Sequence, residues 1–291
     1  MKLVLHINNF SWPGARFGPT LAEIGATADA CGFDRIGVAD HVWQHPIMGG
    51  PETDELECYS TLAFLAANTE RVGLLAVVTG VHFRYPGVLA KTVSTLDVLS
   101  GGRAALGIGA GHYEEEARGL GIPFPPLRTR FEMLDETVQI CLRMWSGECG
   151  DERPFNGRRY RLERPLNLPQ SLSRPHPPIM IAGDGEKKTL RLVARYADAC
   201  NLRPGHEIPR KLEVLRRRCE AEDRDYREIE RTCVFAFDVG ERGERADELV
   251  GQLRWLAGMG VETVIGMVPN ADEISPLEVI GREVVPAIKD L

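Results

Sequence analysis

A short apolar run, a loop and an amphipathic stretch follow one another eight times along this chain of 291 residues. Most of the apolar runs lack strict alternation with polar residues, as expected of parallel strands that are buried on both faces. The eight runs span residues 3–7, 35–39, 72–79, 104–110, 178–182, 197–202, 232–239 and 263–268. Eight strands that alternate strictly with helices close into a (β/α)8 barrel. The sequence therefore predicts an α/β protein with a TIM-barrel fold.

The segments between the apolar runs carry the spacing of amphipathic helices. Leu89, Val93 and Leu96, for example, lie three or four positions apart and so share one helix face. Residues 146–177 depart from this pattern, since they contain five prolines and no long helical period. We predict one domain, 1–291, in which residues 146–177 form an inserted loop or hairpin between the fourth helix and the fifth strand.

Charge and cysteine content exclude several classes of protein. The net charge of −7 argues against a protein that works on nucleic acid. No apolar run approaches the roughly 20 residues that a membrane span needs, and the first ten residues are too quickly polar for a signal peptide. The seven cysteines are scattered, and none forms a C-x-x-C pair. We therefore expect reduced thiols, a cytoplasmic location and a small-molecule substrate.

In a TIM barrel the chemistry lies on the loops that follow the strand C-termini. The loop after the second strand opens with Asp40 and His41, where a carboxylate can accept N–H bonds and an imidazole can move a proton near neutral pH. The alternative is a turn-capping aspartate beside a surface histidine. His45 could pair with His41 on a metal, but no carboxylate-rich third position is evident, and we predict no metal site.

Aromatic side chains follow two of the strands. The loop after the first strand contains Asn9, Phe10 and Trp12, and Trp43 follows His41 closely. These residues suit the wall of a substrate pocket. A solvent-exposed loop explains the first three equally well.

Glycines collect at the ends of the third, fourth and fifth strands. They are Gly80, Gly107, Gly109, Gly111, Gly183 and Gly185. Small residues there let a flat ring or a phosphate approach the backbone. Lys187 and Lys188 open the helix after the fifth strand, and lysines at a helix N-terminus suit a bound anion. The arginines of the insertion are either a solvated charged hairpin or a contact for an acidic ligand tail.

Several common catalytic motifs are missing from the sequence. We find no G-x-S-x-G elbow, no phosphate-binding P-loop and no H-E-x-x-H pair. The first strand also lacks the glycine fingerprint of a dinucleotide-binding fold. These observations disfavour a hydrolase, a nucleotide triphosphatase and a Rossmann dehydrogenase.

Taken in order and spacing, the segments at the strand ends resemble the luciferase-like monooxygenase superfamily over essentially the whole chain. Within the superfamily, the chain resembles the oxidoreductases that use the deazaflavin coenzyme F420. The segments that carry the resemblance are 39–41, 79–81, 99–111, 128–132, 177–186 and 196–202.

The resemblance implies a flavin-like ring at the C-terminal mouth of the barrel. It implies a non-prolyl cis peptide bond at Gly80–Val81, within a bulge that starts at Thr79 and backs the ring. The residues that it assigns to the cofactor are Asp40 at the ring; Ala110, Gly111 and Glu115 along the polyol and phosphate; and Gly183, Asp184 and Gly185 at the phosphate.

The resemblance also places His41 where F420-dependent sugar-phosphate dehydrogenases keep a proton-transfer residue near the substrate. Those enzymes carry a glutamate directly after the fourth-strand glycines, but this chain has His112 there. We see no set of basic residues on the late loops for a sugar phosphate, so that substrate class is not favoured.

We therefore predict an oxidoreductase that moves hydride between F420 and a small organic substrate. His41 and His112 are the catalytic candidates, with Trp43 shaping the pocket. An FMN-dependent monooxygenase that uses reduced FMN and oxygen is the first alternative, and a non-catalytic flavin-binding barrel is the second. The resemblance further implies a homodimer.

Overall fold

The computed structural model describes every residue except 13 and 15, and it contains a closed parallel barrel. The barrel strands are β1 (Lys2–Ile7), β2 (Arg35–Val38), β3 (Gly73–Ala76), β4 (Thr79–Gly80), β5 (Ala104–Gly109), β8 (Ile179–Ala182), β9 (Ala199–Leu202), β10 (Glu230–Ala236) and β11 (Thr263–Met267). β1 pairs with both β2 and β11, and β3 pairs with β5, so the sheet closes on itself. The predicted TIM barrel is confirmed.

The third predicted strand is broken in two, as β3 and β4. β3 ends at Ala76, and the peptide bond between Val77 and Val78 is cis. The prediction of a cis bond at Gly80–Val81 is therefore wrong. Gly80 pairs with Gly109 of β5, and the amide of Val81 donates to the carbonyl of Gly109 at 3.0 Å. Both residues thus form regular hydrogen bonds with β5, and the cis peptide bond lies before them in the chain.

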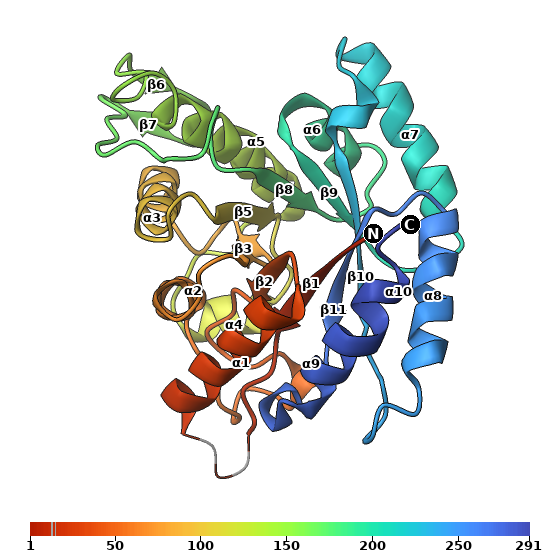
Figure 1. Cartoon of the computed structure of the whole chain (residues 1–291). Coiled ribbons are helices and arrows are strands. Elements are labelled where there is room, and N and C mark those ends of the chain that lie inside the picture. Colours follow the sequence, from red (N-terminus) through yellow and green to blue (C-terminus); the bar gives the residue numbers. More distant parts are fainter. Residues whose placement is uncertain (13, 15) are drawn as a thin grey trace.

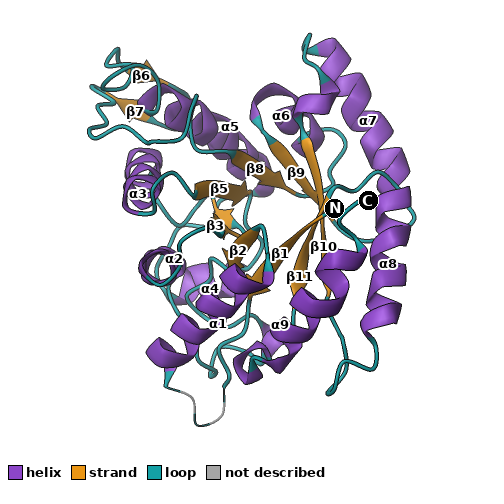
Figure 2. Cartoon of the chain, viewed as in Figure 1, coloured by secondary structure: helices purple, strands orange, loops and turns teal. Residues whose placement is uncertain are grey.

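Helices surround the strands on the outside of the barrel (Figures 1 and 2). They are α1 (Phe17–Cys31), α2 (Cys58–Ala67), α3 (Pro86–Leu99), α4 (Glu114–Gly119), α5 (Leu127–Met144), α6 (Thr189–Tyr196), α7 (Ile208–Ala221), α8 (Ala246–Gly258), α9 (Ser275–Val279) and α10 (Val285–Ala287). The predicted face of α3 is confirmed, since Leu89, Val93 and Leu96 are buried against the sheet. In the part of the chain that the structure describes, no helix is long and apolar enough to cross a membrane.

The apolar core has two layers because side chains alternate along each strand. The larger layer fills the space between the strands and the helices. The smaller layer fills the barrel itself and contains Val4, Leu75, Ala105, Met180, Ala199 and Ile265. His6 follows Val4 by two positions, so the same alternation turns it into the barrel near the C-terminal end of β1.

The insertion at residues 146–177 contains a two-stranded antiparallel hairpin, β6 (Phe155–Asn156) and β7 (Arg161–Leu162), as the sequence predicted. It lies beside α5 in Figure 1. The carboxylate of Glu136 on α5 accepts from the amides of Arg158 and Tyr160, at 2.7 and 2.9 Å. The guanidinium of Arg159 pairs with Glu132 on the same helix. The hairpin thus binds α5 through hydrogen bonds from its backbone amides and through an ion pair.

Candidate active site

A cavity of about 230 Å³ lies at the C-terminal end of the barrel strands. Five of the predicted site residues line it, namely Asp40, His41, Gly80, Gly111 and His112. They come from the loops after β2 and β5 and from β4, which confirms that these strand ends meet. The rings of His41 and His112 lie edge to face, with centroids 5.5 Å apart.

The remaining residues predicted to bind the cofactor lie outside the lining of this cavity. Thr79 and Val81 are buried behind it, and the hydroxyl of Thr79 is 2.8 Å from that of Tyr59. The carbonyl of Ala110 accepts from Arg130 at 2.9 Å, and Glu115 is exposed on α4.

The predicted phosphate loop follows the cavity without lining it. Gly183, Asp184 and Gly185 come directly after Ala182, which does line the cavity. Gly183 has a φ of +116°, in the region that favours glycine. The carboxylate of Asp184 accepts from Arg203 at 3.0 Å, so its charge is paired with a residue that directly follows β9. A phosphate contact through the backbone of this loop stays a prediction.

The aromatic residues predicted to form the substrate pocket do not line this cavity. Phe10 is fully buried, and Trp12 packs against it in the outer core, with ring centroids 5.4 Å apart. Asn9 accepts from the amide of Ser11 in a local turn. Residue 13 of this loop lies outside the described residues. The loop therefore contributes its aromatic rings to the core, where burying them is worth more than exposing them at a mouth.

Trp43 also packs elsewhere than expected. A Cβ at Gly119, at the end of α4, would lie 2.0 Å from the indole ring of Trp43. The indole ring of Trp43 therefore packs against Gly119 of α4 instead of entering the cavity. Only a residue without a side chain leaves room for a ring this close to a helix.

His41 is held by a glutamate that the sequence did not single out. Nδ1 of His41 lies 2.9 Å from Oε2 of Glu116, whose side chain is fully buried. The other carboxylate oxygen accepts from the amides of Val42 and Trp43, at 2.6 and 3.1 Å. Burial raises the pKa of Glu116, but these hydrogen bonds outweigh it and hold the pKa below its ordinary value. Glu116 thus stays ionised and orients the imidazole.

Two further histidines face the cavity from β1 and from the loop after β4. All four ring nitrogens of His6 and His82 are buried and lack a hydrogen-bond partner among the described residues. Burial, together with His41, lowers the pKa of His6 to about 4. Burial, together with Arg130, lowers the pKa of His82 to about 4. Both rings are therefore neutral near pH 7, and each has one donor and one acceptor available for a ligand.

His41 and His112 of the cavity form a cluster with His45, which lies outside the cavity lining. The rings of His41, His45 and His112 lie 5.3–5.8 Å apart between centroids. Burial and the neighbouring His41 lower the pKa values of His45 and His112. Within the described residues, no group of three or more His, Cys, Asp or Glu side chains could hold a metal ion.

Asp40 is buried, and both of its carboxylate oxygens accept from Arg84, at 2.5 and 3.0 Å. Arg84 also reaches Glu57 at 2.5 Å and lies over the ring of Tyr59. Burial lowers the pKa of Arg84, but Asp40 outweighs it, and the net shift is upward. The carboxylate of Asp40 is thus already paired, and its contact with a cofactor ring stays a prediction.

Sequence reasoning missed Glu116, His6 and His82. Acidic residues in the first turn of a helix match its dipole, and α4 does begin at Glu114, so the run Glu114–Glu116 carries no sequence signal of a further role. The helical turn exposes Glu114 and Glu115 but buries Glu116. For His6 a signal existed, because strict alternation in β1 groups it with Val4 on the barrel interior.

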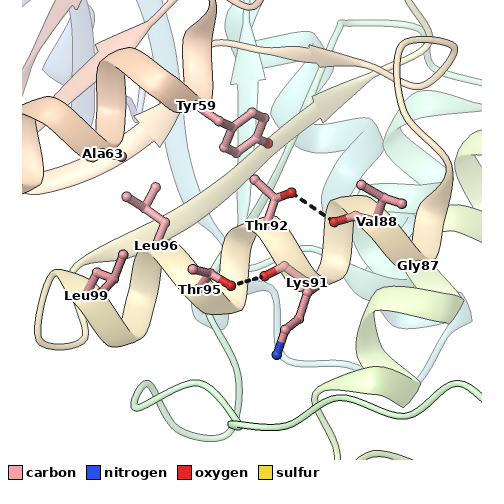
Figure 3. Close-up of a pocket in the computed structure, with 9 residues that line it drawn as sticks. All are labelled: Tyr59, Ala63, Gly87, Val88, Lys91, Thr92, Thr95, Leu96 and Leu99. Atoms are coloured by element: carbon pink, nitrogen blue, oxygen red, sulfur yellow. Dashed lines mark hydrogen bonds between the residues drawn. The ribbon is translucent and has the colours of Figure 1, made fainter.

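A second, more apolar hollow of about 430 Å³ lies between α2 and α3, on the outside of the barrel. Figure 3 shows its walls, with Tyr59 and Ala63 on one side and Val88, Thr92 and Leu96 on the other. It contains none of the histidines and carboxylates of the central cavity. The cavity at the strand ends is therefore the candidate active site.

Comparison with known proteins agrees with this fold. Residues 7–279 match the protein family described as luciferase-like monooxygenase. An F420-dependent glucose-6-phosphate dehydrogenase of Kineococcus radiotolerans is 31% identical over 80% of this chain and 68% of its own length. The same enzyme of Microbacterium testaceum is 38% identical over 46% of this chain, and the match spans only 39% of that relative's length.

Solved structures share the fold at low sequence identity. A monooxygenase from Streptomyces bottropensis superposes with a TM-score of 0.80 at 21% identity, covering 98% of this chain and 99% of its own. A coenzyme F420-dependent tetrahydromethanopterin reductase from Methanopyrus kandleri superposes with a TM-score of 0.78 at 16% identity, covering 98% of each chain. These likenesses establish the fold.

Proposed function

The chain belongs to the luciferase-like monooxygenase family, and from this premise we propose that it transfers hydride between coenzyme F420 and a small organic substrate. The family comprises flavin- and deazaflavin-dependent oxidoreductases. The observation that carries the choice of F420 is the 31% identity, over most of the chain, to a relative named for its F420 dependence.

The residues at the cavity fit a heteroaromatic ring. The unpartnered nitrogens of His6 and His82 offer donors and acceptors that a ring with carbonyl and N–H groups satisfies. A Cβ atom would lie 2.7 Å from the His82 ring if placed at Gly80, and 2.5 Å from it if placed at Gly111. Only glycine at these two positions therefore leaves room for the imidazole of His82. Ligand sites usually measure about 300–1,000 Å³. The cavity, about 230 Å³, therefore suits a ring better than a whole coenzyme.

In the proposed mechanism, His41 accepts the proton of the substrate hydroxyl and returns it in the reverse direction. When bound, F420 supplies or accepts the hydride at C5 of its ring. As hydride leaves a substrate carbon that bears a hydroxyl, the hydroxyl proton passes to Nε2 of His41, and in the reverse direction Nε2 returns it to the carbonyl oxygen. Glu116 leaves Nε2 available by bonding to Nδ1 and stabilises the imidazolium that forms. His112 lies beside His41 as a second polar contact for the substrate.

The first test is a titration of the purified protein with F420 and, separately, with FMN, followed by ring fluorescence. We expect saturable binding of F420 and much weaker binding of FMN. Binding of FMN alone would overturn the cofactor assignment and favour the FMN-dependent monooxygenase. Binding of neither ring would contradict the enzyme hypothesis.

The second test replaces the proposed proton carrier. His41→Asn should lower kcat by about 100-fold or more, since general acid–base catalysis contributes at least that much. The dissociation constant for F420 should change little. His206→Asn is the matched control, because His206 contacts Trp255 away from the cavity. Wild-type turnover in the His41 variant would refute the role given to His41, whereas tight ligand binding without turnover in either protein would favour the non-catalytic flavin-binding barrel.

The homodimer and the cytoplasmic location stay predictions. All seven cysteines are free thiols, which agrees with a reducing compartment. Light scattering of the purified protein measures the mass in solution and thereby tests the homodimer.

A further inference from the structure

We propose that Tyr113 binds the substrate through its buried hydroxyl, and that this substrate is an uncharged alcohol or the corresponding carbonyl compound; the inference rests on the proposed function. Tyr113 lines the central cavity and is 7% exposed. Its phenolic oxygen is buried and has no hydrogen-bond partner among the described residues. A buried polar group requires a partner, and in a ligand site the ligand supplies it.

The backbone places the phenol ring of Tyr113 beside the proposed proton carrier. Tyr113 follows His112 after β5 and directly precedes α4. Its ring lies edge to face against that of His41, with centroids 5.9 Å apart, and against that of His45, at 5.1 Å. One substrate can therefore contact both the imidazole of His41 and the hydroxyl of Tyr113.

The hydroxyl of Tyr113 stays protonated and can act as a donor. Burial raises its pKa above the ordinary value, and the carboxylates of Glu115, Glu116 and Glu52 raise it further. Tyr113 thus keeps its proton during the reaction. The hydride leaves the carbon that bears the substrate hydroxyl, the proton of that hydroxyl passes to Nε2 of His41, and Tyr113 donates a hydrogen bond to the oxygen that becomes the carbonyl.

The charges at the cavity disfavour an anionic substrate. Among the described residues that line it, none is a lysine or an arginine. His6 and His82 are neutral near pH 7, because burial lowers the pKa of each to about 4. The carboxylates of Asp40 and Glu116 also belong to the lining residues. An incoming phosphate would therefore meet negative charges and find no lysine or arginine to pair with.

Two arginines contact residues of the cavity wall without lining the cavity, and both are engaged within the protein. Arg84 donates to both oxygens of Asp40, at 2.5 and 3.0 Å. Arg130 donates to the carbonyls of Ala110 and Pro125, at 2.9 and 2.6 Å. The donors and acceptors of the cavity that lack a partner are neutral, and neutral groups suit a hydroxyl or a carbonyl.

The substrate class is tested by following the reduction of F420 with 2-propanol, cyclohexanol, glucose and glucose 6-phosphate. Glucose and glucose 6-phosphate differ only in the phosphate, so their comparison isolates the effect of its charge. At least one uncharged alcohol should react with a kcat/KM about tenfold or more above that of glucose 6-phosphate.

Two outcomes would overturn the substrate class and leave the proposed function standing. One is a preference for glucose 6-phosphate. The other is no turnover of any uncharged alcohol by protein that binds F420. Failure to bind F420 would instead count against the proposed function.

The role of Tyr113 is tested with Tyr113→Phe, which removes only the phenolic oxygen. The free variant should melt about 1–4 °C above the wild-type protein, because a buried oxygen without a partner is removed. Its KM for the best uncharged alcohol should rise about 3- to 10-fold, as for loss of one neutral hydrogen bond. Its dissociation constant for F420 should stay the same. A hydroxyl with a structural role would instead lower the melting temperature when removed.

Tyr85→Phe is the matched control, because Tyr85 is 78% exposed directly before α3 and water satisfies its hydroxyl. This variant should match the wild-type protein in melting temperature and in KM. An unchanged KM in Tyr113→Phe, or a melting temperature below that of the wild-type protein, would overturn the role of Tyr113.

Discussion

At the scale of single residues, Glu116 determines how His41 is presented to the cavity. Its two oxygens hold Nδ1 of His41 and the amides of the next two residues. Glu116→Gln removes the negative charge and leaves one acceptor, so we expect kcat to fall about 10- to 100-fold, as for loss of a hydrogen bond to a charged group. KM and the affinity for F420 should change much less, because the cavity walls remain.

Steady-state kinetics of this variant should be compared with those of Glu114→Gln. Glu114 is an exposed residue on the same helix and pairs with Arg118. Equal kinetics in the two variants would refute a positioning role for Glu116.

Glu55 makes the stability of the fold depend on pH. Both of its carboxylate oxygens are buried without a hydrogen-bond partner among the described residues. Burial, with Glu116 and Asp40 nearby, raises its pKa to about 8 from an ordinary value of 4.5. A raised carboxyl pKa favours the folded state at low pH, and this stability is lost as pH rises from 4.5 to about 8.

We therefore expect Glu55→Gln to raise the free energy of unfolding by about 2 kcal/mol near pH 8 and to leave it unchanged near pH 4.5. Urea unfolding across this range measures the difference. Glu52→Gln, at an exposed position in the same loop, should be neutral throughout. A pH-independent effect of the Glu55 variant would show that its carboxyl group is not the titrating one.

At the scale of elements, Arg84 joins three segments beside the cavity. From the connection between β4 and α3 it reaches Asp40 after β2 and Glu57 at the start of α2. Arg84→Met leaves the buried carboxylate of Asp40 without its partner, and we expect the free energy of unfolding to fall by about 3–5 kcal/mol. Chemical denaturation measures this loss.

Two comparisons check that the loss comes from the unpaired charge. Asp40→Asn combined with Arg84→Met should recover part of the stability, because no buried charge then remains. Arg118→Met removes an exposed i,i+4 pair with Glu114 and should cost less than about 1 kcal/mol. If Arg84→Met cost no more than Arg118→Met, this ion pair would not hold the elements together.

At the scale of the whole molecule, closure of the barrel depends on a glycine. A Cβ at Gly107 of β5 would lie 1.9 Å from the carbonyl oxygen of Ala76, where β3 ends. Neither strand can move without opening the barrel, so Gly107→Ala should cost on the order of 3 kcal/mol or more. Thermal unfolding, or loss of folded protein on expression, checks this expectation.

Gly251→Ala is the matched control, because nothing lies within 4 Å of a Cβ at this position in α8. It should stabilise the protein by up to about 1 kcal/mol, the difference between glycine and alanine in a helix. A Gly107 variant that melts with the wild-type protein would mean that the strands adapt more easily than the barrel geometry implies.

Local patterns predicted most of the fold and part of the site. The alternation of apolar runs and helices is a property of neighbouring residues, and it indicated the barrel, the hairpin insertion and the strand ends where Asp40, His41 and Gly80 meet. The same patterns misplaced Phe10 and Trp12. A loop rich in aromatic residues has the same sequence pattern whether its rings contact a ligand or the core. They also misplaced the cis bond, since the break in the third strand depends on how β3 and β4 pair with β5.

By itself, the sequence determined the eightfold barrel, the end of it at which the candidate site residues lie and the resemblance to F420-dependent enzymes. Only the tertiary structure decided which side chains act together. Glu116 meets His41 across 75 positions, and Asp40 meets Arg84 across 44. The physical reason is that periodicity fixes which face a residue occupies, whereas its partner depends on how helices rotate and pack against the closed sheet.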